Sequence, residues 1–420
     1  MTINELIKIV NGISIINSDE IINDIKTDTR KIKQGDIFIA LKGNNYDGHN
    51  YIEEAIKKGS IACIVEEDIE NDKCIKVSST YKSLFDIGKY LRNKYDIPLI
   101  AITGSNGKTT TKELITHILK SKYNVLYNKD SKNNLIGVSD TLFKLNNKYD
   151  VIVMELGTNH IGEIKELSSM CLPNTSIITN IGTSHIGYFK NKKNIFKEKI
   201  SISNKNLIVC GDDKYLKKIN AYKCGINKNN DLIAYDIKES IDKIVFNIYL
   251  DKEYKIVFNN PGKHFISDIL LAIKVCLDYK IDIDTIIDRI NSFRLVNKRM
   301  NIIKSKSNII INDCYNASLE SIKSGIEYMN NIKENKVFII GDILELGKHS
   351  KRIHKKINKL LNKEKVYTIG NYSKYIKGNN FNNVDELINY LNINKIENRY
   401  IYIKGSRRMN LDKIVEYLKK

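Results

Sequence analysis

The chain has 420 residues, of which 42% are hydrophobic and 28% charged, so it has the composition of a globular protein and is too long for one ordinary domain core. Its formal net charge is +19, which would suit a nucleic-acid binder or a collector of anionic substrates. The basic residues are spread along the chain and form no single stripe, so we expect no nucleic-acid partner.

The first 82 residues have the pattern of a small α/β unit. Short apolar stretches, "GDIFIALKG" and "SIACIVEE", alternate with a helical segment, "NYIEEAIKKG". We therefore expect an N-terminal domain over residues 1–82.

A longer alternation of strands and helices follows over residues 83–296. A helical stretch leads into "IPLIAITG", a short apolar run typical of a buried parallel strand, and similar runs come later at "DVIVMELG", "NTSIITNIG" and "NLIVCGDD". Between them, "KTTTKELITHILKSK" places Leu114, Ile115, Ile118 and Leu119 on one helix face. This alternation predicts a doubly wound, mainly parallel sheet that binds ligands at the carboxyl ends of its strands.

The pattern begins again over residues 297–420, where "NIIINDCYN", "KVFIIGD", "KVYTIG" and "RYIYIKGS" are strand-like and helical stretches separate them. A Rossmann-like C-terminal domain is the interpretation that we favour. The predicted fold is therefore α/β, with a small N-terminal α/β domain, a central P-loop parallel-sheet domain of ATPase type and a Rossmann-like C-terminal domain.

A phosphate-binding loop is predicted at "AITGSNGKTTT", residues 101–111. A strand, a glycine turn, Lys-Thr and a helix put backbone N–H groups, a helix N-terminus and an ammonium around one anion, which indicates ATP or GTP binding. The usual G-x-x-x-x-G-K-[ST] pattern would place a glycine at position 102, where Ile102 stands. The expected nucleotide ligands are Gly104, Ser105, Asn106, Gly107, Lys108, Thr109 and Thr110.

Other polar residues lie at the ends of predicted strands. Glu155 ends "VIVME", where a second magnesium contact is expected beside Thr109, although a strand-end acid can also simply face water. His185 and Lys199, each taken alone, are more typical of structural or solvated residues than of catalytic ones. The segments "NNLIG", "DCYNAS" and "KGSRRM" could offer polar ligands or be plain loops.

The ordered set of motifs resembles the Mur ligases through all three predicted domains. The resemblance rests on "TDTRKIKQGDIFIALKGNNYDGHNYIEEAIKKG", "TGSNGKTTTKE", "NNLIGV", "MELGTNHIGEI", "TNIGTSHIGYF", "KEKI", "DCYNAS", "GDILELG" and "IKGSR". Mur ligases carry T-G-x-x-G-K-T, so Ile102 fits this family. "ELGTNHIGEI" and "GDILELG" are similar to the members that add a dipeptide, and not to those that add single amino acids or to folylpolyglutamate synthase.

The resemblance implies a reaction in peptidoglycan precursor synthesis. ATP, with Mg²⁺, would phosphorylate the terminal carboxylate of UDP-N-acetylmuramoyl-tripeptide, and the amine of D-alanyl-D-alanine would attack the acyl phosphate, with release of ADP and phosphate. Lys108 would stabilise charge on the transferring phosphoryl group. The resemblance makes Lys108, Lys199 and His185 catalytic, with Lys199 carried as a carbamate, and its metal ligands are Thr109, Glu155, His185 and Lys199. We expect a monomer.

The resemblance also implies binding residues in each domain. Those for the UDP-sugar and the peptide are Thr29, Arg30, Lys42, Asp47, Asn133, Asn134 and Thr158, and those for the nucleotide beyond the loop are Asp268, Arg299, Asp313, Tyr315 and Asn316. Two stretches depart from the family. Ser318 and Leu319 stand where N-A-N-P has its second asparagine and its proline, and Phe265 and Asp268 replace two asparagines of an adenine-binding stretch.

Three alternatives remain open from the residues. A different Mur-type ligase would accept another amine, a P-loop nucleic-acid binder would lose affinity steeply with salt, and a non-catalytic homologue would explain the altered motifs. The third position of the tripeptide, lysine or diaminopimelate, is not specified.

The sequence also predicts where the protein functions. The seven cysteines form no C-x-x-C pair, and no apolar run approaches the roughly 18 residues of a membrane helix. The N-terminus lacks a secretory signal, so we expect a cytoplasmic protein without membrane insertion.

Overall fold

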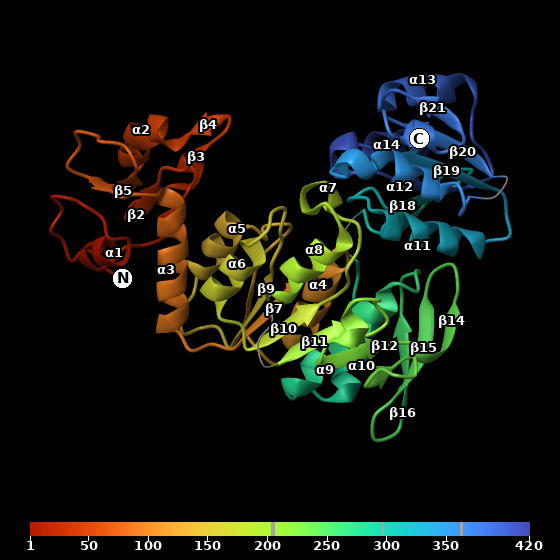
Figure 1. The fold of residues 1–420 in the computed structure, drawn as a ribbon, viewed down its shortest axis with the longest axis horizontal. Coiled ribbons are helices and arrows are strands. Elements are labelled where there is room, and N and C mark those ends of the chain that lie inside the picture. Colours follow the sequence, from red (N-terminus) through yellow and green to blue (C-terminus); the bar gives the residue numbers. More distant parts are fainter. Residues whose placement is uncertain (203–205, 296–297, 362–363) are drawn as a thin grey trace. The chain divides into compact units, whose positions relative to one another are not determined.

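The computed structural model describes residues 1–202, 206–295, 298–361 and 364–420 (Figure 1). The chain divides into two compact units. Unit 1 comprises Met1–Ala101, Tyr123–Thr158 and Gly162–Thr175, and unit 2 comprises Ile102–Lys122, Asn159–Ile161 and Ser176–Lys420. Among the helices of the described ranges, none combines the length and the apolarity that crossing a membrane requires.

Unit 1 opens with a four-stranded sheet in the order β1-β2-β5-β6, in which every pairing is parallel. Its core packs Phe38 and Cys63 of the strands, and Ala40 directly after β2, against Ile52 and Ala55 of a helix. The strands are β1 (Ile25–Lys26), β2 (Asp36–Ile39), β5 (Ser60–Val65) and β6 (Cys74–Lys76), with a hairpin of β3 (Lys42–Gly43) and β4 (Tyr46–Asp47). The helices are α1 (Ile3–Ile9), η1 (Thr29–Lys31), η2 (Gly48–Tyr51), α2 (Ile52–Lys57) and α3 (Thr80–Lys94). The predicted N-terminal α/β unit is confirmed.

Helix α3 also organises the rest of unit 1. It contacts α5 (Leu135–Leu142) and α6 (Glu163–Cys171), and β8 (Val125–Tyr127) pairs in parallel with β9 (Val151–Glu155). Ser79 caps α3 by accepting from the Lys82 amide, and the buried Arg92 near its end donates to the Cys171 carbonyl at 2.8 Å. This bond fixes the end of α6, since it satisfies a carbonyl that the helix itself leaves without a partner.

Unit 2 begins around the end of β7 (Leu99–Thr103), which leads into the phosphate loop and α4 (Lys108–Leu119). The strands β10 (Thr175–Ile178), β11 (Leu207–Cys210), β12 (Tyr222–Gly225) and β13 (Leu232–Ile233) are hydrogen-bonded in this order, all in parallel. Leu114, Ile115, Ile118 and Leu119 are fully buried, which confirms the predicted apolar face of α4. The other helices here are α7 (Ile186–Phe189), α8 (Lys192–Ile200), η3 (Leu216–Lys218), α9 (Phe265–Asp278) and α10 (Ile283–Ser292).

An antiparallel sheet that the sequence reading did not predict follows β13 (green in Figure 1). Its strands are β14 (Tyr235–Glu239), β15 (Ile244–Tyr249) and β16 (Glu253–Phe258). In β15 the side chains of Ile244, Phe246 and Ile248 are buried and alternate with more exposed ones. Such alternation is typical of a sheet with one solvated face, whereas a continuous apolar run is typical of a strand buried on both faces.

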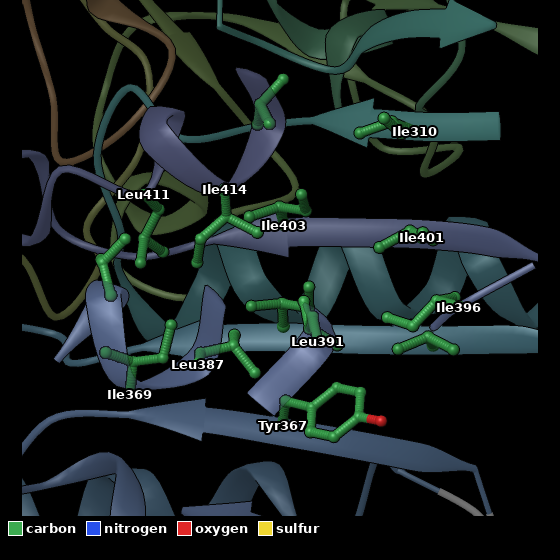
Figure 2. Packing of buried hydrophobic residues seen from close by; sticks show 14 of the residues in the cluster. Ile310, Tyr367, Ile369, Leu387, Leu391, Ile396, Ile401, Ile403, Leu411 and Ile414 are labelled. Carbon is green, nitrogen blue, oxygen red and sulfur yellow. The ribbon is translucent and has the colours of Figure 1, made fainter. Parts of the chain in front are cut away.

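The C-terminal part of unit 2 is a six-stranded sheet in the order β17-β18-β22-β19-β20-β21, parallel except for the edge strand β17. Figure 2 shows Tyr367, Ile401 and Ile403 of the sheet packed with Leu387 and Ile414 of two helices. The strands are β17 (Asn301–Lys304), β18 (Ile309–Asn312), β19 (Lys336–Gly341), β20 (Lys365–Ile369), β21 (Asn379–Phe381) and β22 (Tyr400–Lys404). The helices are α11 (Leu319–Asn330), η4 (Gly347–His349), α12 (Ser350–Ile357), η5 (Ser373–Tyr375), α13 (Val384–Ile393), η6 (Arg407–Met409) and α14 (Asp412–Lys419). The predicted α/β fold with parallel sheets is confirmed.

Candidate active site

The phosphate loop is held by the backbone and side chains that follow β10. The Asn106 amide donates to Asn180 Oδ1 at 3.0 Å, and Thr179 Oγ1 donates to the Asn106 carbonyl at 2.5 Å. Gly104 and Gly107 both have positive φ, and a Cβ on Gly104 would lie 1.8 Å from Thr179 Oγ1. Glycine is therefore required at position 104 by conformation and by space, as the sequence pattern suggests.

Two lysines that lie far apart in the sequence converge on one oxygen of this loop. Lys108 Nζ donates to the Gly104 carbonyl at 3.0 Å, and the buried Lys199 Nζ, from the last turn of α8, donates to the same oxygen at 2.9 Å. The two nitrogens are thus separated by no more than the sum of these distances. Spacing alone could not link Lys199 to the loop, whereas the fold places it there.

The buried Asp268 of α9 lies against the other glycine of the loop. Its Oδ1 accepts from Thr111 Oγ1 at 3.1 Å, and a Cβ on Gly107 would lie 2.4 Å from the same oxygen. Burial raises the pKa of Asp268 to about 7, although the Thr111 hydrogen bond and the charge of Arg299 act in the opposite direction. Asp268 therefore contacts the phosphate-binding segment itself, and a direct bond to the nucleotide stays a prediction.

The replacement Asp268→Asn is expected to stabilise the protein at neutral and higher pH. A carboxyl whose pKa is about 3.8 when unfolded and about 7 when folded holds its proton more tightly in the folded state, so the free energy of unfolding falls as pH rises through this window. The difference corresponds to up to about 4 kcal/mol. Urea unfolding at several pH values between 4 and 8 measures it, with Asp284→Asn at an exposed position of α10 as the control. Parallel pH profiles for the wild type and the Asp268 variant would contradict the expectation.

His185 meets an acidic residue of the C-terminal sheet's loops. His185 Nδ1 lies 2.5 Å from Glu345 Oε2, and the Gly187 amide donates to the Glu345 carbonyl at 3.0 Å. The contact with His185 lowers the pKa of Glu345, against the effect of partial burial. His185 and Glu345 both have positive φ, an uncommon conformation for residues other than glycine. The "GDILELG" motif thus supplies a carboxylate to His185, a role that the sequence did not reveal.

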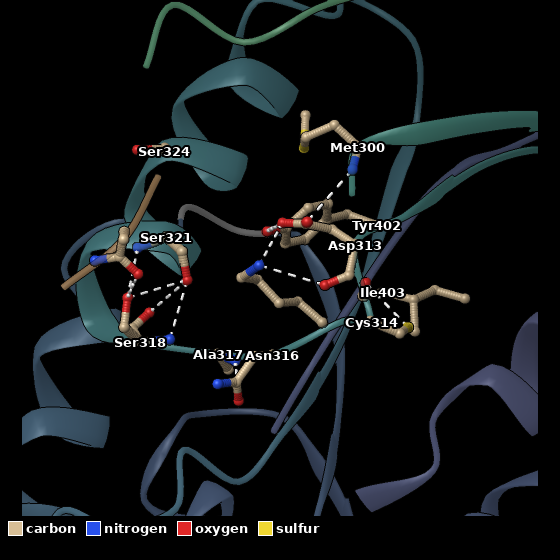
Figure 3. A network of polar contacts seen from close by, with 12 residues as sticks. Met300, Asp313, Cys314, Asn316, Ala317, Ser318, Ser321, Ser324, Tyr402 and Ile403 are labelled. Carbon is tan, nitrogen blue, oxygen red and sulfur yellow. Dashed lines mark hydrogen bonds and ion pairs between the residues drawn. The ribbon is translucent and has the colours of Figure 1, made fainter. Parts of the chain in front are cut away.

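Of the predicted nucleotide ligands of the C-terminal domain, Asp313 lies in a network of polar contacts with Met300 and Tyr402 (Figure 3). The Asp313 carboxylate is buried and accepts from Tyr402 Oη at 3.0 Å and from Lys404 Nζ at 2.5 Å, so internal partners bind it. The Arg299 guanidinium stacks 4.1 Å from the centre of the Tyr315 ring, and Asn316 is exposed. The Asp313 carboxylate is therefore occupied by neighbouring residues, and direct contacts of Asp313, Tyr315 and Asn316 with a nucleotide remain predictions.

In unit 1, Glu155 is almost fully buried and is held in place by neighbouring amides. Asn133 Nδ2 donates to Glu155 Oε1 at 2.7 Å, and Asn128 bonds both backbone groups of Glu155. The alternative of a strand-end acid facing water is therefore wrong. Asn134 caps α5 by accepting from the Gly137 amide, and Thr158 is buried.

The residues predicted to bind the UDP-sugar lie in the N-terminal part of unit 1. Arg30 has an exposed side chain that pairs with Asp28 at 2.8 Å, and this pairing lowers the pKa of Asp28 to about 2. Thr29 is buried at the start of η1. Lys42 Nζ forms ion pairs with Asp47 at 2.9 Å and Glu67 at 3.0 Å, so Lys42 and Asp47 bind each other. Their contacts with a substrate stay predictions.

Three family models match the chain. The Mur ligase family catalytic domain matches residues 21–87, the Mur ligase middle domain residues 102–276, and the Mur ligase glutamate ligase domain residues 298–407. Each matched segment carries part of the geometry described above. The middle-domain match contains Lys108, Asp268 and Lys199.

Curated relatives and solved structures agree with these matches. The UDP-N-acetylmuramoyl-tripeptide--D-alanyl-D-alanine ligase of Buchnera aphidicola subsp. Baizongia pistaciae is 35% identical over 87% of this chain and 85% of its own. The enzyme of the same name from Bacillus subtilis is 31% identical over 84% and 80%. A crystal structure of MurF from Acinetobacter baumannii superposes with a TM-score of 0.92 at 27% identity, covering 100% of this chain and 99% of the other. MurF from Thermotoga maritima, in complex with ADP, has a TM-score of 0.87 at 23% identity over 96% and 98%.

Proposed function

We infer the activity from one premise, which is that this chain belongs to the Mur ligase family. It is an ATP-dependent ligase that joins D-alanyl-D-alanine to UDP-N-acetylmuramoyl-tripeptide in peptidoglycan precursor synthesis. The observation within the molecule that carries this function is the convergence of Lys108 and Lys199 on the Gly104 carbonyl of the phosphate loop. A phosphate loop alone would indicate only that a nucleotide binds.

The chemistry requires activation of a carboxylate, which is a poor electrophile. Transfer of the γ-phosphoryl group of ATP gives an acyl phosphate and ADP, and the dipeptide amine then displaces phosphate to form the amide bond. Lys108 and the loop amides stabilise the charge that develops on the transferring phosphoryl group. Asp313, Tyr315 and Asn316 lie on the C-terminal domain, which we propose as the domain that binds the incoming dipeptide.

We also propose which residues bind Mg²⁺. We propose Thr109 and Glu155 as ligands of the first ion, because hydroxyl and carboxylate oxygens are the donors that Mg²⁺ prefers. His185 offers a ring nitrogen as a ligand, and its contact with Glu345 places a carboxylate beside the ring. When bound, Mg²⁺ neutralises phosphate charge.

Lys199 is proposed to carry a carbamate. Two ammonium groups on one carbonyl oxygen, of which the Lys199 group is buried and the Lys108 group is partly buried, repel each other more strongly than they would in water. After the Lys199 ammonium loses a proton, the neutral amine nitrogen can bond to the carbon of carbon dioxide and release a second proton, and the anionic carbamate that results removes the repulsion and provides oxygen ligands. The repulsion between Lys108 and Lys199 therefore supports carbamylation of Lys199.

The amine acceptor is the most direct test of the function. Phosphate release from ATP is measured with UDP-N-acetylmuramoyl-tripeptide in the presence of D-alanyl-D-alanine, of D-alanine or of no acceptor. Of the three conditions, we expect sustained phosphate release only in the one that contains D-alanyl-D-alanine. The other two leave the acyl phosphate without its proper nucleophile. Tripeptides ending in lysine and in diaminopimelate identify the preferred donor. Equal rates in all three conditions would contradict the proposed dipeptide specificity.

Compartment, oligomeric state and domain limits are properties of the whole chain. We propose a cytoplasmic monomer with domain limits of 1–82, 83–296 and 297–420. The seven cysteines are all free and buried, which supports a reducing compartment. A different Mur-type ligase is the second candidate, and the same acceptor assay separates it from the first.

A further inference from the structure

The first turn of α11 carries a carboxylate that contacts the segment following β10. Glu320 Oε2 accepts from the Thr183 amide at 3.0 Å and from Thr183 Oγ1 at 2.7 Å. Its other oxygen, Oε1, accepts from Lys192 Nζ at 2.9 Å. Glu320 thus joins the C-terminal part of unit 2 to α8 and to the loop before α7.

The same segment supports the phosphate loop on its other side. The Gly182 amide donates to Ser105 Oγ at 2.8 Å, and Ser184 Oγ donates to the Ser105 carbonyl at 3.1 Å. A Cβ on Gly182 would lie 3.0 Å from both Ser105 Cβ and Glu320 Oε2. Residues 182–184 are therefore packed between the loop and Glu320, with no room for a larger side chain at Gly182.

A second contact from α11 reaches the loop directly. Ser318, which caps α11, donates from Oγ to Asn106 Oδ1 at 2.9 Å. Ser318 is one of the residues that depart from the family pattern. Together, Ser318 and Glu320 connect the start of one helix to both Ser105 and Asn106, the two residues between the glycine Gly104 and the glycine Gly107.

Glu320 holds these partners as an anion. Burial acts to raise its pKa, but the charge of Lys192 and the hydrogen bonds from Lys192 and Thr183 outweigh burial, so its pKa lies below the ordinary value. Hydrogen bonds to a carboxylate are stronger than those between neutral groups. The bonds from Thr183 and Lys192 to Glu320 are therefore charge-assisted.

We propose that Glu320 is a positioning residue that couples docking of the C-terminal domain to the conformation of the phosphate loop. It acts on the loop through Thr183 and Gly182. Because the dipeptide is proposed to bind the C-terminal domain and ATP binds the loop, each ligand then strengthens the binding of the other. The inference rests on the proposed function for the identity of these two ligands.

The test is a measurement of coupling in the full chain. The dissociation constant of a non-hydrolysable ATP analogue is measured by calorimetry with and without saturating D-alanyl-D-alanine, with UDP-N-acetylmuramoyl-tripeptide present throughout. In the wild type we expect the dipeptide to tighten nucleotide binding by at least about fivefold. In Glu320→Ala the ratio is expected to approach one, and in Glu320→Gln, which keeps an acceptor for Thr183, to lie between the two.

Glu327 provides the matched control, because it is an exposed glutamate on the same helix, paired with Lys323 at 3.5 Å. Glu327→Ala should keep the wild-type ratio. The inference is overturned by an unchanged ratio in a folded Glu320→Ala, by a wild-type ratio of one, or by an equal loss in the Glu327 variant. Ligation of the dipeptide by the wild type is scored separately and tests the proposed function alone.

Discussion

Replacement of Lys199 by alanine is expected to nearly abolish ligation and leave the fold intact. Lys199 Nζ lies 2.9 Å from the carbonyl oxygen of Gly104, so its removal changes the charge next to the transferring phosphate. Loss of one group that stabilises charge in the transition state lowers kcat by about 10²–10³-fold. Alanine favours the helical conformation, so α8 should persist, which circular dichroism can check.

The matched control for this variant is Lys197→Ala. Lys197 is exposed on the same helix, and its replacement should leave turnover near the wild-type rate. Phosphate release in the acceptor assay gives both rates. Near-normal turnover of Lys199→Ala would remove Lys199 from the catalytic residues.

Carbamylation of Lys199 is tested by the same pair of variants. Labelled bicarbonate should give a carbamate carbonyl signal in the NMR spectrum of the wild type and of the Lys197 variant, and none in Lys199→Ala. Depletion of carbon dioxide should lower wild-type turnover, and added bicarbonate should restore it. Turnover that is indifferent to bicarbonate, with no carbonyl signal, would show that Lys199 acts as an unmodified amine.

The second large effect is expected for Lys108→Ala. Lys108 is the first residue of α4, and its Nζ folds back onto the loop at 3.0 Å from the Gly104 carbonyl. An ammonium there stabilises charge that grows as the phosphoryl group transfers, so its loss should lower kcat by about 10²–10³-fold. The measurement is the rate of ADP formation at saturating substrates.

The kinetic pattern of Lys108→Ala distinguishes two roles. A fall of kcat and of kcat/KM together indicates stabilisation of the transition state, whereas a raised KM for ATP with unchanged kcat indicates equal binding of ground and transition states. The second pattern would contradict the proposed role. Lys120→Ala, exposed at the end of α4, is the control and should change neither parameter.

Local features of this molecule followed from local sequence. The apolar face of α4 and the strands at "DVIVMELG" and "KVFIIGD" were predicted because burial on both faces leaves a continuous apolar run. The sheet of β14, β15 and β16 was missed because it alternates with a period of two residues. A search for alternation over Ile244–Tyr249 would have found β15.

Contacts between distant residues did not follow from sequence. Lys199 and Gly104 are 95 positions apart, and only the folded sheet brings them together. Composition also cannot distinguish a carboxylate offered to a ligand from one bound by its neighbours, as Asp313 is bound by Lys404 and Tyr402. Neither Glu320 nor Glu345 could be recognised from sequence: Glu345 lies within "GDILELG", where no role was assigned to it, and Glu320 lies two residues beyond "DCYNAS".

The antiparallel sheet has a consequence for the order in which the molecule is made. Tyr328 of α11 donates from Oη to the Ile241 carbonyl at 2.8 Å, and Asn331 donates to Glu239 at 2.8 Å, across separations of 87 and 92 residues. On the ribosome, the β14–β15 hairpin is synthesised about 4 to 18 seconds before its partners on α11, at roughly 5–20 residues per second. A hairpin forms within about 1–10 μs, so this one can be complete when α11 emerges and can offer it two preformed hydrogen-bond acceptors.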